Sequence, residues 1–225
     1  MRLVFASNNA HKLSEVRAMM PEGIEVLSLK DIGFEAEIEE TGETLEENSL
    51  IKAQTVWDWI VESRKSKVES IDGVFADDTG LEIDALNGEP GVYTARWYRR
   101  EPTLTLPKGK EMTDEMLNFH CNRAKALREL EGKENRGCQF RTVITLLMNG
   151  DATLNGGMIQ IEGVVRGRIA EEEYGEGGFG YDPVFIPEGY DKTFGELPAE
   201  LKNHISHRAR AIQELVKVLN DRMMD

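Results

Sequence analysis

The order of the apolar segments constrains the fold of this chain more than any other feature of its sequence. Changes of hydrophobic period predict a strand at residues 2–6, a helix at 11–20, a strand at 24–29 and a long helix at 45–63. Strands that alternate with helices from the start of a chain are typical of α/β proteins. The sequence therefore predicts an α/β fold.

The long helix has a well-marked start. Thr44 is followed three residues later by Glu47, which is the spacing of a capping box. Thr44, Asn48 and Lys52 recur every four residues and therefore share one polar face. Lys52 can reach a phosphate group from that face, although a lysine on the wet face of a helix is usually only a solubilising charge.

The rest of the chain is expected to continue as strands and helices. Strands are predicted at 74–77 and 81–86, a helix at 113–130, two or three antiparallel strands over 137–169, further strands to about 186, and a last helix at 206–223 with Ser206 as its N-cap. The Pro- and charge-containing stretch 99–111 is expected to be a loop. Since no repeat or linker divides the sequence, residues 1–225 are expected to form a single domain.

The composition of the chain limits the classes of partner that it can bind. The chain has 225 residues and a net charge of −14, so its surface would repel nucleic acid and anionic membranes. No apolar run approaches the ~20 residues of a membrane span, and the apolar start reads as a strand rather than a signal peptide. Cys121 and Cys138 are too far apart for a Cys-x-x-Cys pair and are expected to be reduced thiols of a cytoplasmic protein.

Polar residues directly follow the first strand. Ser7, Asn9 and Lys12 lie between this strand and the next helix, where backbone N–H groups and an ammonium can converge on phosphate. The segment lacks the glycines of a P-loop, so a plain strand-to-helix turn is the alternative.

Two acidic pairs suit a hard cation. Glu39-Glu40 precede a Thr-Gly turn, and Asp77-Asp78 are expected to end a short apolar strand. Carboxylates at such positions can hold Mg²⁺. Two charges after an apolar strand are costly unless something compensates them, so the Asp pair is the stronger candidate, with an Asx turn or helix cap as the alternative.

A glycine-rich loop at 175–182 displays an aromatic ring where a core residue would not normally lie. Phe179 in this loop offers a flat face for a base, and an aromatic that closes a sheet edge is the alternative. Downstream, Lys202 and Ser206-His207-Arg208 bring hydrogen-bond donors to the start of a helix. No Gly-x-Ser-x-Gly elbow is present, so a serine-hydrolase triad is poorly supported.

Six ordered motifs, which run nearly from end to end, together resemble one family: the inosine/xanthosine triphosphate pyrophosphatases, which remove deaminated purine nucleotides. They are Ser-x-Asn-x-x-Lys, Glu-Glu-Thr-Gly-x-Thr-x-x-Glu-Asn, Ala-Asp-Asp-Thr-Gly-Leu, Pro-Gly-Val-Tyr-Thr-Ala-Arg, Gly-Gly-Phe-Gly-Tyr-Asp-Pro and Ser-His-Arg. The resemblance implies an elongated mixed β-sheet flanked by helices, with two lobes around a central nucleotide-binding cleft. It also implies a homodimer that uses Mg²⁺ to hydrolyse a purine nucleoside triphosphate to its monophosphate and pyrophosphate.

The resemblance also implies roles for single residues. Asp78 would be the general base and would share the metal with Glu39. Phosphate contacts would come from Ser7, Asn9, Lys12, Lys52 and Thr79. The base would be held by Phe179, which stacks on it, with Gly180 and Tyr181 in the same loop, and by Asp182, Lys202, His207 and Arg208, which read its edge or order the residues that do.

The sequence departs from the family pattern in two ways. The segments 62–72 and 99–111 are longer than expected for bacterial relatives, and Thr79 and Thr94 stand where serine is expected. Two rival interpretations remain. The related Maf-like pyrophosphatases act on other nucleotides, but the Phe179 loop and Ser-His-Arg argue against them. A catalytically idle nucleotide sensor would not need Lys12, Glu39 and Asp78 together.

Overall fold

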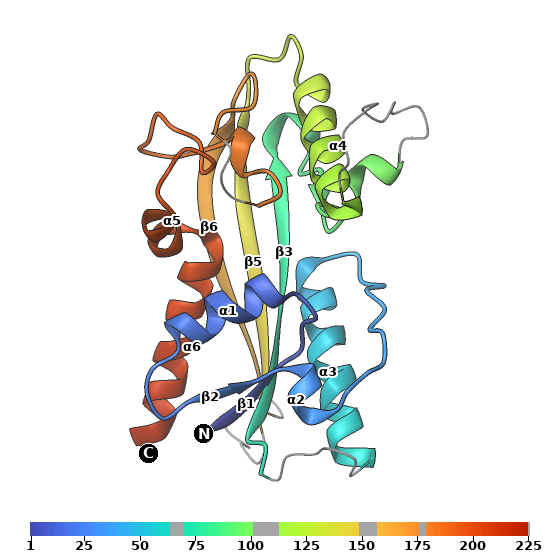
Figure 1. The fold of residues 1–225 in the computed structure, drawn as a ribbon, viewed down its shortest axis with the longest axis vertical. Helices are drawn as coiled ribbons and strands as arrows, with labels where there is room; N and C mark the ends of the chain where they lie inside the picture. Colours follow the sequence, from blue (N-terminus) through green and yellow to red (C-terminus); the bar gives the residue numbers. More distant parts are fainter. Residues whose placement is uncertain (64–69, 101–112, 149–156, 176–178, 225) are drawn as a thin grey trace. The chain divides into compact units, whose positions relative to one another are not determined.

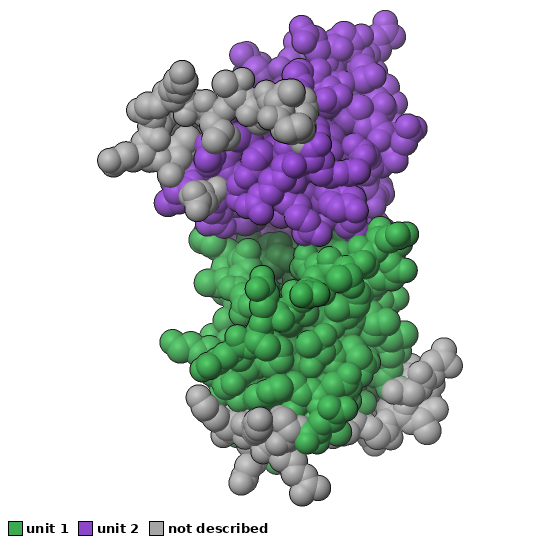
Figure 2. All heavy atoms as spheres, turned by 90° about the vertical axis from the view of Figure 1, so that its right-hand side faces the viewer, with its two compact units in different colours: residues 1–78, 142–163, 207–225 green, residues 79–141, 164–206 purple. Residues whose placement is uncertain are grey.

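A computed structural model describes residues 1–63, 70–100, 113–148, 157–175 and 179–224 (Figure 1). The chain divides into two compact units, coloured separately in Figure 2. Unit 1 comprises residues 1–78, 142–163 and 207–225, and unit 2 comprises residues 79–141 and 164–206. Three strands contribute residues to both units: β3 (Gly73–Ile83), β5 (Gly137–Met148) and β6 (Met158–Ile169).

The strands form one mixed sheet in the order β2-β1-β3-β5-β6-β7, and β4 pairs with β3 outside this path. β1 (Arg2–Phe5) runs parallel to β2 (Glu25–Leu27) and to β3. β4 (Pro90–Gly91) is antiparallel to β3, and β7 (Phe185–Pro187) is antiparallel to β6. The predicted α/β class with a mixed sheet is confirmed.

In unit 1 the sheet is covered on both faces. Leu3 and Phe5 of β1 belong to one apolar cluster, whereas Val4 and Ala6 belong to another, as expected for side chains that alternate along a strand. Helices α1 (Ala10–Met19) and α6 (His207–Met224) cover the first face. Helices α2 (Leu29–Ile32) and α3 (Leu45–Ser63) cover the second (Figure 1).

The start of α6 packs very close to β6. A Cβ atom added to Gly163 of β6 would lie 2.1 Å from the carbonyl oxygen of His207 and 2.4 Å from the backbone nitrogen of Ala211. Only glycine permits this approach. The contact fixes the backbone at the first turn of α6, from which His207 and Arg208 project.

Unit 2 has its own core. The ends of β3, β5 and β6 pack with β7, with the helix α4 (Asp114–Glu129) and with Trp97, which is 1% exposed. Three 3₁₀ turns lie at Asp84–Leu86, Trp97–Arg100 and Asp182–Val184. The short helix α5 (Ala199–Ile205) ends the unit.

Three sequence predictions were wrong in detail. The strands expected at 74–77 and 81–86 are one continuous strand, β3, and residues 84–86 form a 3₁₀ turn. Leu29 begins helix α2 rather than ending a strand, because Ser28 and Asp31 form a capping box. Helix α5 was missed, whereas Ser206, which ends α5, also stands directly before α6 with extended backbone, the position predicted for the N-cap of the last helix.

Other predictions were confirmed or fall outside the described residues. The capping box of α3 is present, with the Glu47 N–H donating to Thr44 Oγ1 at 3.1 Å and the Thr44 N–H donating to Glu47 Oε2 at 3.2 Å. Most of the expected loop at 99–111 lies outside the described residues, as does Gly178. None of the helices in the described ranges is long and apolar enough to cross a membrane.

Candidate active site

Two neighbouring carboxylates are buried in the middle of strand β3. Asp77 is 3% exposed and Asp78 is 8% exposed. The sequence prediction placed this pair at a strand end, which was wrong, because β3 continues through both residues to Ile83. A charged pair inside a strand is costly to bury unless cations compensate it.

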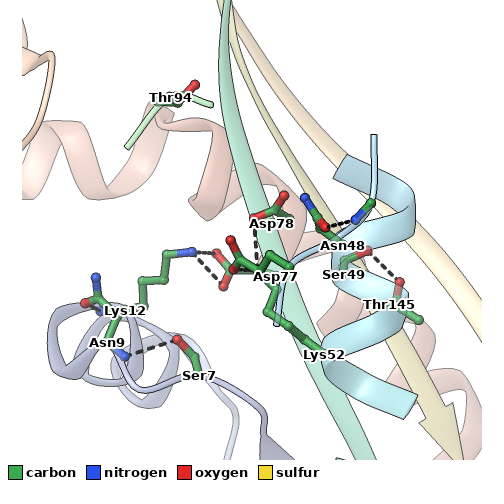
Figure 3. Close-up of polar contacts among 12 residues, drawn as sticks. Ser7, Asn9, Lys12, Asn48, Ser49, Lys52, Asp77, Asp78, Thr94 and Thr145 are labelled. Atoms are coloured by element: carbon green, nitrogen blue, oxygen red, sulfur yellow. Dashed lines mark hydrogen bonds and ion pairs between the residues drawn. The ribbon is translucent and has the colours of Figure 1, made fainter. Parts of the chain in front are cut away.

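Two lysines supply that compensation from opposite sides (Figure 3). Lys12, on α1, places its Nζ 2.9 Å from Asp77 Oδ1 and 2.8 Å from Oδ2. Lys52, on α3, donates from Nζ to Asp78 Oδ1 at 2.9 Å and to Glu40 Oε1 at 2.8 Å. Unit 1 thus brings together Lys12, Lys52 and Asp78, three of the predicted site residues.

The environment shifts the pKa values of these groups. Burial opposes the charge of Asp77, but Lys12 and Arg208 outweigh it and hold the pKa of Asp77 well below its usual range. Burial raises the pKa of Asp78 despite the opposing effect of Lys52. Asp78 is therefore the more basic of the two carboxylates.

The pKa values of the two lysines shift in opposite directions. Burial lowers the pKa of Lys12, against the attraction of Asp77. For Lys52, burial is outweighed by Asp78, Asp77 and Glu40, whose charges raise its pKa. The ammonium of Lys52 is therefore held firmly in its charged form.

Ser7 and Asn9 shape the turn that carries Lys12. Ser7 Oγ accepts a hydrogen bond from the Asn9 N–H at 3.2 Å. Asn9 is the N-cap of α1, and its Oδ1 accepts from the Lys12 N–H at 3.0 Å. The turn interpretation thus describes the contacts of these side-chain oxygens, and their expected contact with phosphate stays a prediction.

His207 and Arg208 begin helix α6 in unit 1. The Arg208 Nε lies 3.6 Å from Asp77 Oδ2, and its Nη1 donates to Glu15 Oε2 on α1. His207 is 8% exposed. Both were expected to read the edge of a base or to order the residues that do, which stays a prediction; the structure places the guanidinium of Arg208 beside the buried Asp77.

The loop of Glu39 and Glu40 is held by a buried asparagine. Asn48 on α3 is fully buried, and its Oδ1 accepts from the Gly42 N–H at 2.8 Å. The Asn48 Nδ2 is buried and has no hydrogen-bond partner among the described residues. Asn48 and Lys52 of the predicted polar face on α3 are therefore turned inward, whereas Thr44 is exposed; Asn48 was predicted to share that face but was not named as a site residue.

The donor set near Lys52 suits a divalent cation. Glu40 and Asp78 both form ion pairs with the ammonium of Lys52, at 2.8 and 2.9 Å. Among the described residues, no group of three or more His, Cys, Asp or Glu side chains forms a metal cage. Mg²⁺ commonly uses only one or two carboxylates together with phosphate oxygens of a substrate. Glu39 is exposed, and its expected part in a metal site with Asp78 stays a prediction.

Unit 2 carries the aromatic loop. Phe179 is 40% exposed, and its backbone N–H donates to Asp182 Oδ2 at 2.5 Å. Lys202 donates from Nζ to the same oxygen, also at 2.5 Å. Asp182 and Lys202 therefore hold the backbone of Phe179, and the expectation that they read the edge of a base, or order the residues that do, stays a prediction.

One further contact, through Tyr181, holds the end of this loop. Tyr181 is buried and donates from its Oη to the Thr94 carbonyl oxygen at 3.1 Å, and burial raises the pKa of its phenol. Thr94 uses its own hydroxyl to accept from the Leu81 N–H at 2.8 Å and to donate to the Gly91 oxygen at 2.6 Å. Thr79, which begins unit 2, is half-buried in β3.

A comparison with models of known protein families shows to which family the chain belongs. The family model described as the Ham1 family matches residues 3–218. The chain belongs to the Ham1 family. The family's solved structures include the Staphylococcus aureus Ham1 protein, which is 34% identical, with a TM-score of 0.75 and 99% of this chain and 100% of that chain covered.

Relatives in the Ham1 family extend over almost the whole chain. A Flavobacterium johnsoniae protein named dITP/XTP pyrophosphatase is 44% identical, with 97% of this chain and 98% of the relative covered. A Bacillus subtilis protein of the same name is 42% identical, with 96% of each chain covered. The family relationship predicted from the six motifs is confirmed.

Proposed function

We propose that this Ham1-family protein hydrolyses the deaminated purine nucleoside triphosphates ITP, dITP and XTP to the monophosphate and pyrophosphate, and so removes them from the nucleotide pool. Relatives at 44% and 42% identity carry the name dITP/XTP pyrophosphatase. The observation that carries the proposal is the buried Asp77–Asp78 pair, which Lys12 and Lys52 approach from two helices.

Cleavage between the α- and β-phosphates needs an activated water and neutralisation of the phosphoryl oxygens. Asp78 is the general base in this proposal. Its burial makes the carboxylate more basic, and the Lys52 ammonium fixes its Oδ1, which leaves the carboxylate oriented to take a proton from water. Lys12 and Lys52 supply positive charge for the triphosphate.

Asp78 and Glu39 would hold Mg²⁺, with Glu40 beside them on Lys52. The bound ion would supply charge neutralisation on the phosphates and on the leaving pyrophosphate. The loop of Glu39 depends on Asn48, which fixes Gly42. Asn48 thus acts as a support for the carboxylate loop.

The base is assigned to unit 2, where Phe179 presents an exposed ring and Asp182 and Lys202 order its loop. Stacking on an aromatic ring is worth ~1–3 kcal/mol per base. Donors directed at O6 would favour keto purines over adenine, and a mismatch of buried polar groups can discriminate by ~10⁴. His207 and Arg208 stay in the proposal as residues that read the edge of the base or order the residues that do. Ser7, Asn9 and Thr79 stay in it as phosphate contacts.

Assembly and location complete the proposal. We expect a homodimer in the cytoplasm that binds a small nucleotide and no nucleic acid, in line with the net charge of −14. Light scattering during size-exclusion chromatography tests the dimer, and a monomer at all concentrations would contradict it.

The deciding experiment is product analysis with Mg²⁺ and a panel of ITP, XTP, dITP, ATP and GTP, scored for pyrophosphate against orthophosphate. Pyrophosphate release confined to ITP, XTP and dITP is expected. Orthophosphate release, or equal rates on ATP, would contradict the reaction or the base assignment. Thermal stabilisation by nucleotide without turnover would favour the sensor interpretation instead.

A further inference from the structure

Helix α4 contacts the aromatic loop of unit 2 at two points. The ring centroids of Phe119 and Phe179 are 4.4 Å apart, with an interplanar angle of 68°, which is an edge-to-face arrangement. One turn further along α4, Arg123 donates from Nη1 to the Gly180 carbonyl oxygen at 2.8 Å. Phe119 and Arg123 are four residues apart and therefore lie on the same face of the helix.

Arg123 is itself held in place. Its Nε lies 3.0 Å from Glu173 Oε2, and its side chain is only 14% exposed. A guanidinium bound to both a carboxylate and a carbonyl oxygen loses little further freedom when it orders a loop. The hydrogen bond to Gly180 therefore ties the loop to α4.

The backbone of Phe179 is held by Asp182, but that hydrogen bond does not fix the orientation of the exposed ring. Phe179 is 40% exposed, and Gly180 follows it with a φ of +62°. An exposed side chain on a glycine-containing loop samples several rotamers, and ordering it on binding costs affinity. Contact with Phe119 on one side of the ring limits those rotamers before a ligand arrives.

We propose that Phe119 and Arg123 are positioning residues for purine recognition, which preorganise Phe179 so that its remaining exposed surface receives the base. This inference rests on the proposed function. Neither residue needs to touch the nucleotide, because both act through the Phe179–Gly180 segment.

Steady-state kinetics with ITP test this inference in the full-length protein. Phe119→Leu and Arg123→Gln are each expected to raise KM about 2- to 10-fold, the range of one aromatic pair or one hydrogen bond, with kcat nearly unchanged. Phe119→Tyr keeps the ring and is expected to retain a KM near that of the wild type. Inhibition by inorganic tripolyphosphate, which has no base, is expected to be unchanged in all three variants.

A double-mutant cycle separates positioning from general damage. In a Phe179→Ala background, Phe119→Leu is expected to raise KM no further, because its route to the base has been removed. Met116→Ala, at a 55% exposed position of the same helix, is the matched control and is expected to leave KM unchanged.

Each other outcome overturns a specific statement. Fully additive effects of Phe119→Leu and Phe179→Ala, or a KM that moves only with Phe179→Ala, would overturn the positioning role. A loss of thermal stability in Phe119→Leu without a change in KM would reduce that residue to a packing contact and overturn its role as well. Absence of ITP turnover in the wild type would overturn the proposed function, and this inference with it.

Discussion

The Lys12 ammonium contacts both carboxylate oxygens of Asp77, at 2.9 and 2.8 Å, although the two residues are 65 positions apart in the chain. Asp77 is almost fully buried, so its charge depends on this partner and on Arg208 at 3.6 Å. Removal of one member of a buried ion pair leaves an uncompensated charge, whereas removal of both members does not.

Lys12→Met is therefore expected to destabilise the fold by about 3 kcal/mol, the lower end of the range for a broken buried pair, since Arg208 remains beside Asp77. The double variant Lys12→Met/Asp77→Asn is expected to recover part of this loss. Urea unfolding measures both free energies. Lys217→Met, which breaks an exposed pair with Glu214, is the control and should change stability by less than ~1 kcal/mol. Equal losses in the single and double variants would contradict the pairing.

Asp78→Asn is expected to abolish turnover of ITP while it leaves nucleotide binding largely intact. The amide keeps an oxygen for the Lys52 hydrogen bond but cannot take a proton from water. A loss of kcat by ~10²–10⁴ or more is the expected scale for a general base. Initial rates and calorimetric titration with ITP check the two halves of this statement. A variant with wild-type-like rates would remove Asp78 as the base.

Gly42→Ala is expected to disturb the loop that carries Glu39 and Glu40. A Cβ atom at Gly42 would lie 2.7 Å from Glu47 Cβ and 2.8 Å from Asn48 Oδ1, so the turn would have to move. We expect a higher Mg²⁺ requirement for ITP hydrolysis and a loss of stability of about 1–3 kcal/mol. Activity measured against Mg²⁺ concentration, with the melting temperature in parallel, checks both. An unchanged Mg²⁺ dependence would separate this loop from the metal.

Because the thiol of Cys138 is buried, we expect the protein to lose stability at alkaline pH. Burial raises the pKa of its thiol far above the ordinary value of 9.0. A group whose pKa is raised in the folded state contributes stability that is fully present below the unfolded pKa and is lost as the pH rises above it. The free energy of unfolding should therefore decline above about pH 9, by at most ~1.4 kcal/mol per pH unit from this thiol.

Urea titrations at a series of pH values compare the wild type with Cys138→Ala. The variant is expected to show a shallower decline above about pH 9, because its unfolded state has lost one ionising thiol. Tyr181, whose pKa burial also raises above its ordinary value of 10.0, steepens the decline at still higher pH in both proteins. If the free energy of unfolding falls equally steeply with pH in both proteins near pH 9, the Cys138 thiol is not the cause of the decline there.

Local chemistry explains which parts of the fold were predictable. The start of α3 was predicted correctly because Thr44 and Glu47 bond each other's backbone groups within one turn. Strand β3 was misread as two strands because Asp77, Asp78, Thr79 and Gly80 have the composition of a turn. The strand continues there because Lys12 and Lys52, from distant segments, compensate its charges.

The site was predictable in part for the same reason. The motifs indicated Lys12, Lys52 and Asp78, and the structure brings their side chains into one cluster. The hydrogen bonds of Asn48 with Gly42 and of Arg123 with Gly180 were not predictable from periodicity, because each joins a side chain to a backbone group of a distant segment.

The close approach of Gly163 to the first turn of α6 has a consequence for engineering this protein. Replacement of glycine by alanine in a regular element is a common route to higher thermostability. At position 163 the same change would push against the His207 carbonyl oxygen and the Ala211 backbone nitrogen, at 2.1 and 2.4 Å. A library of stabilising variants would therefore have to keep Gly163. A Cβ atom at this position would make β6 less flexible, but it would also displace the Arg208 guanidinium that lies beside Asp77.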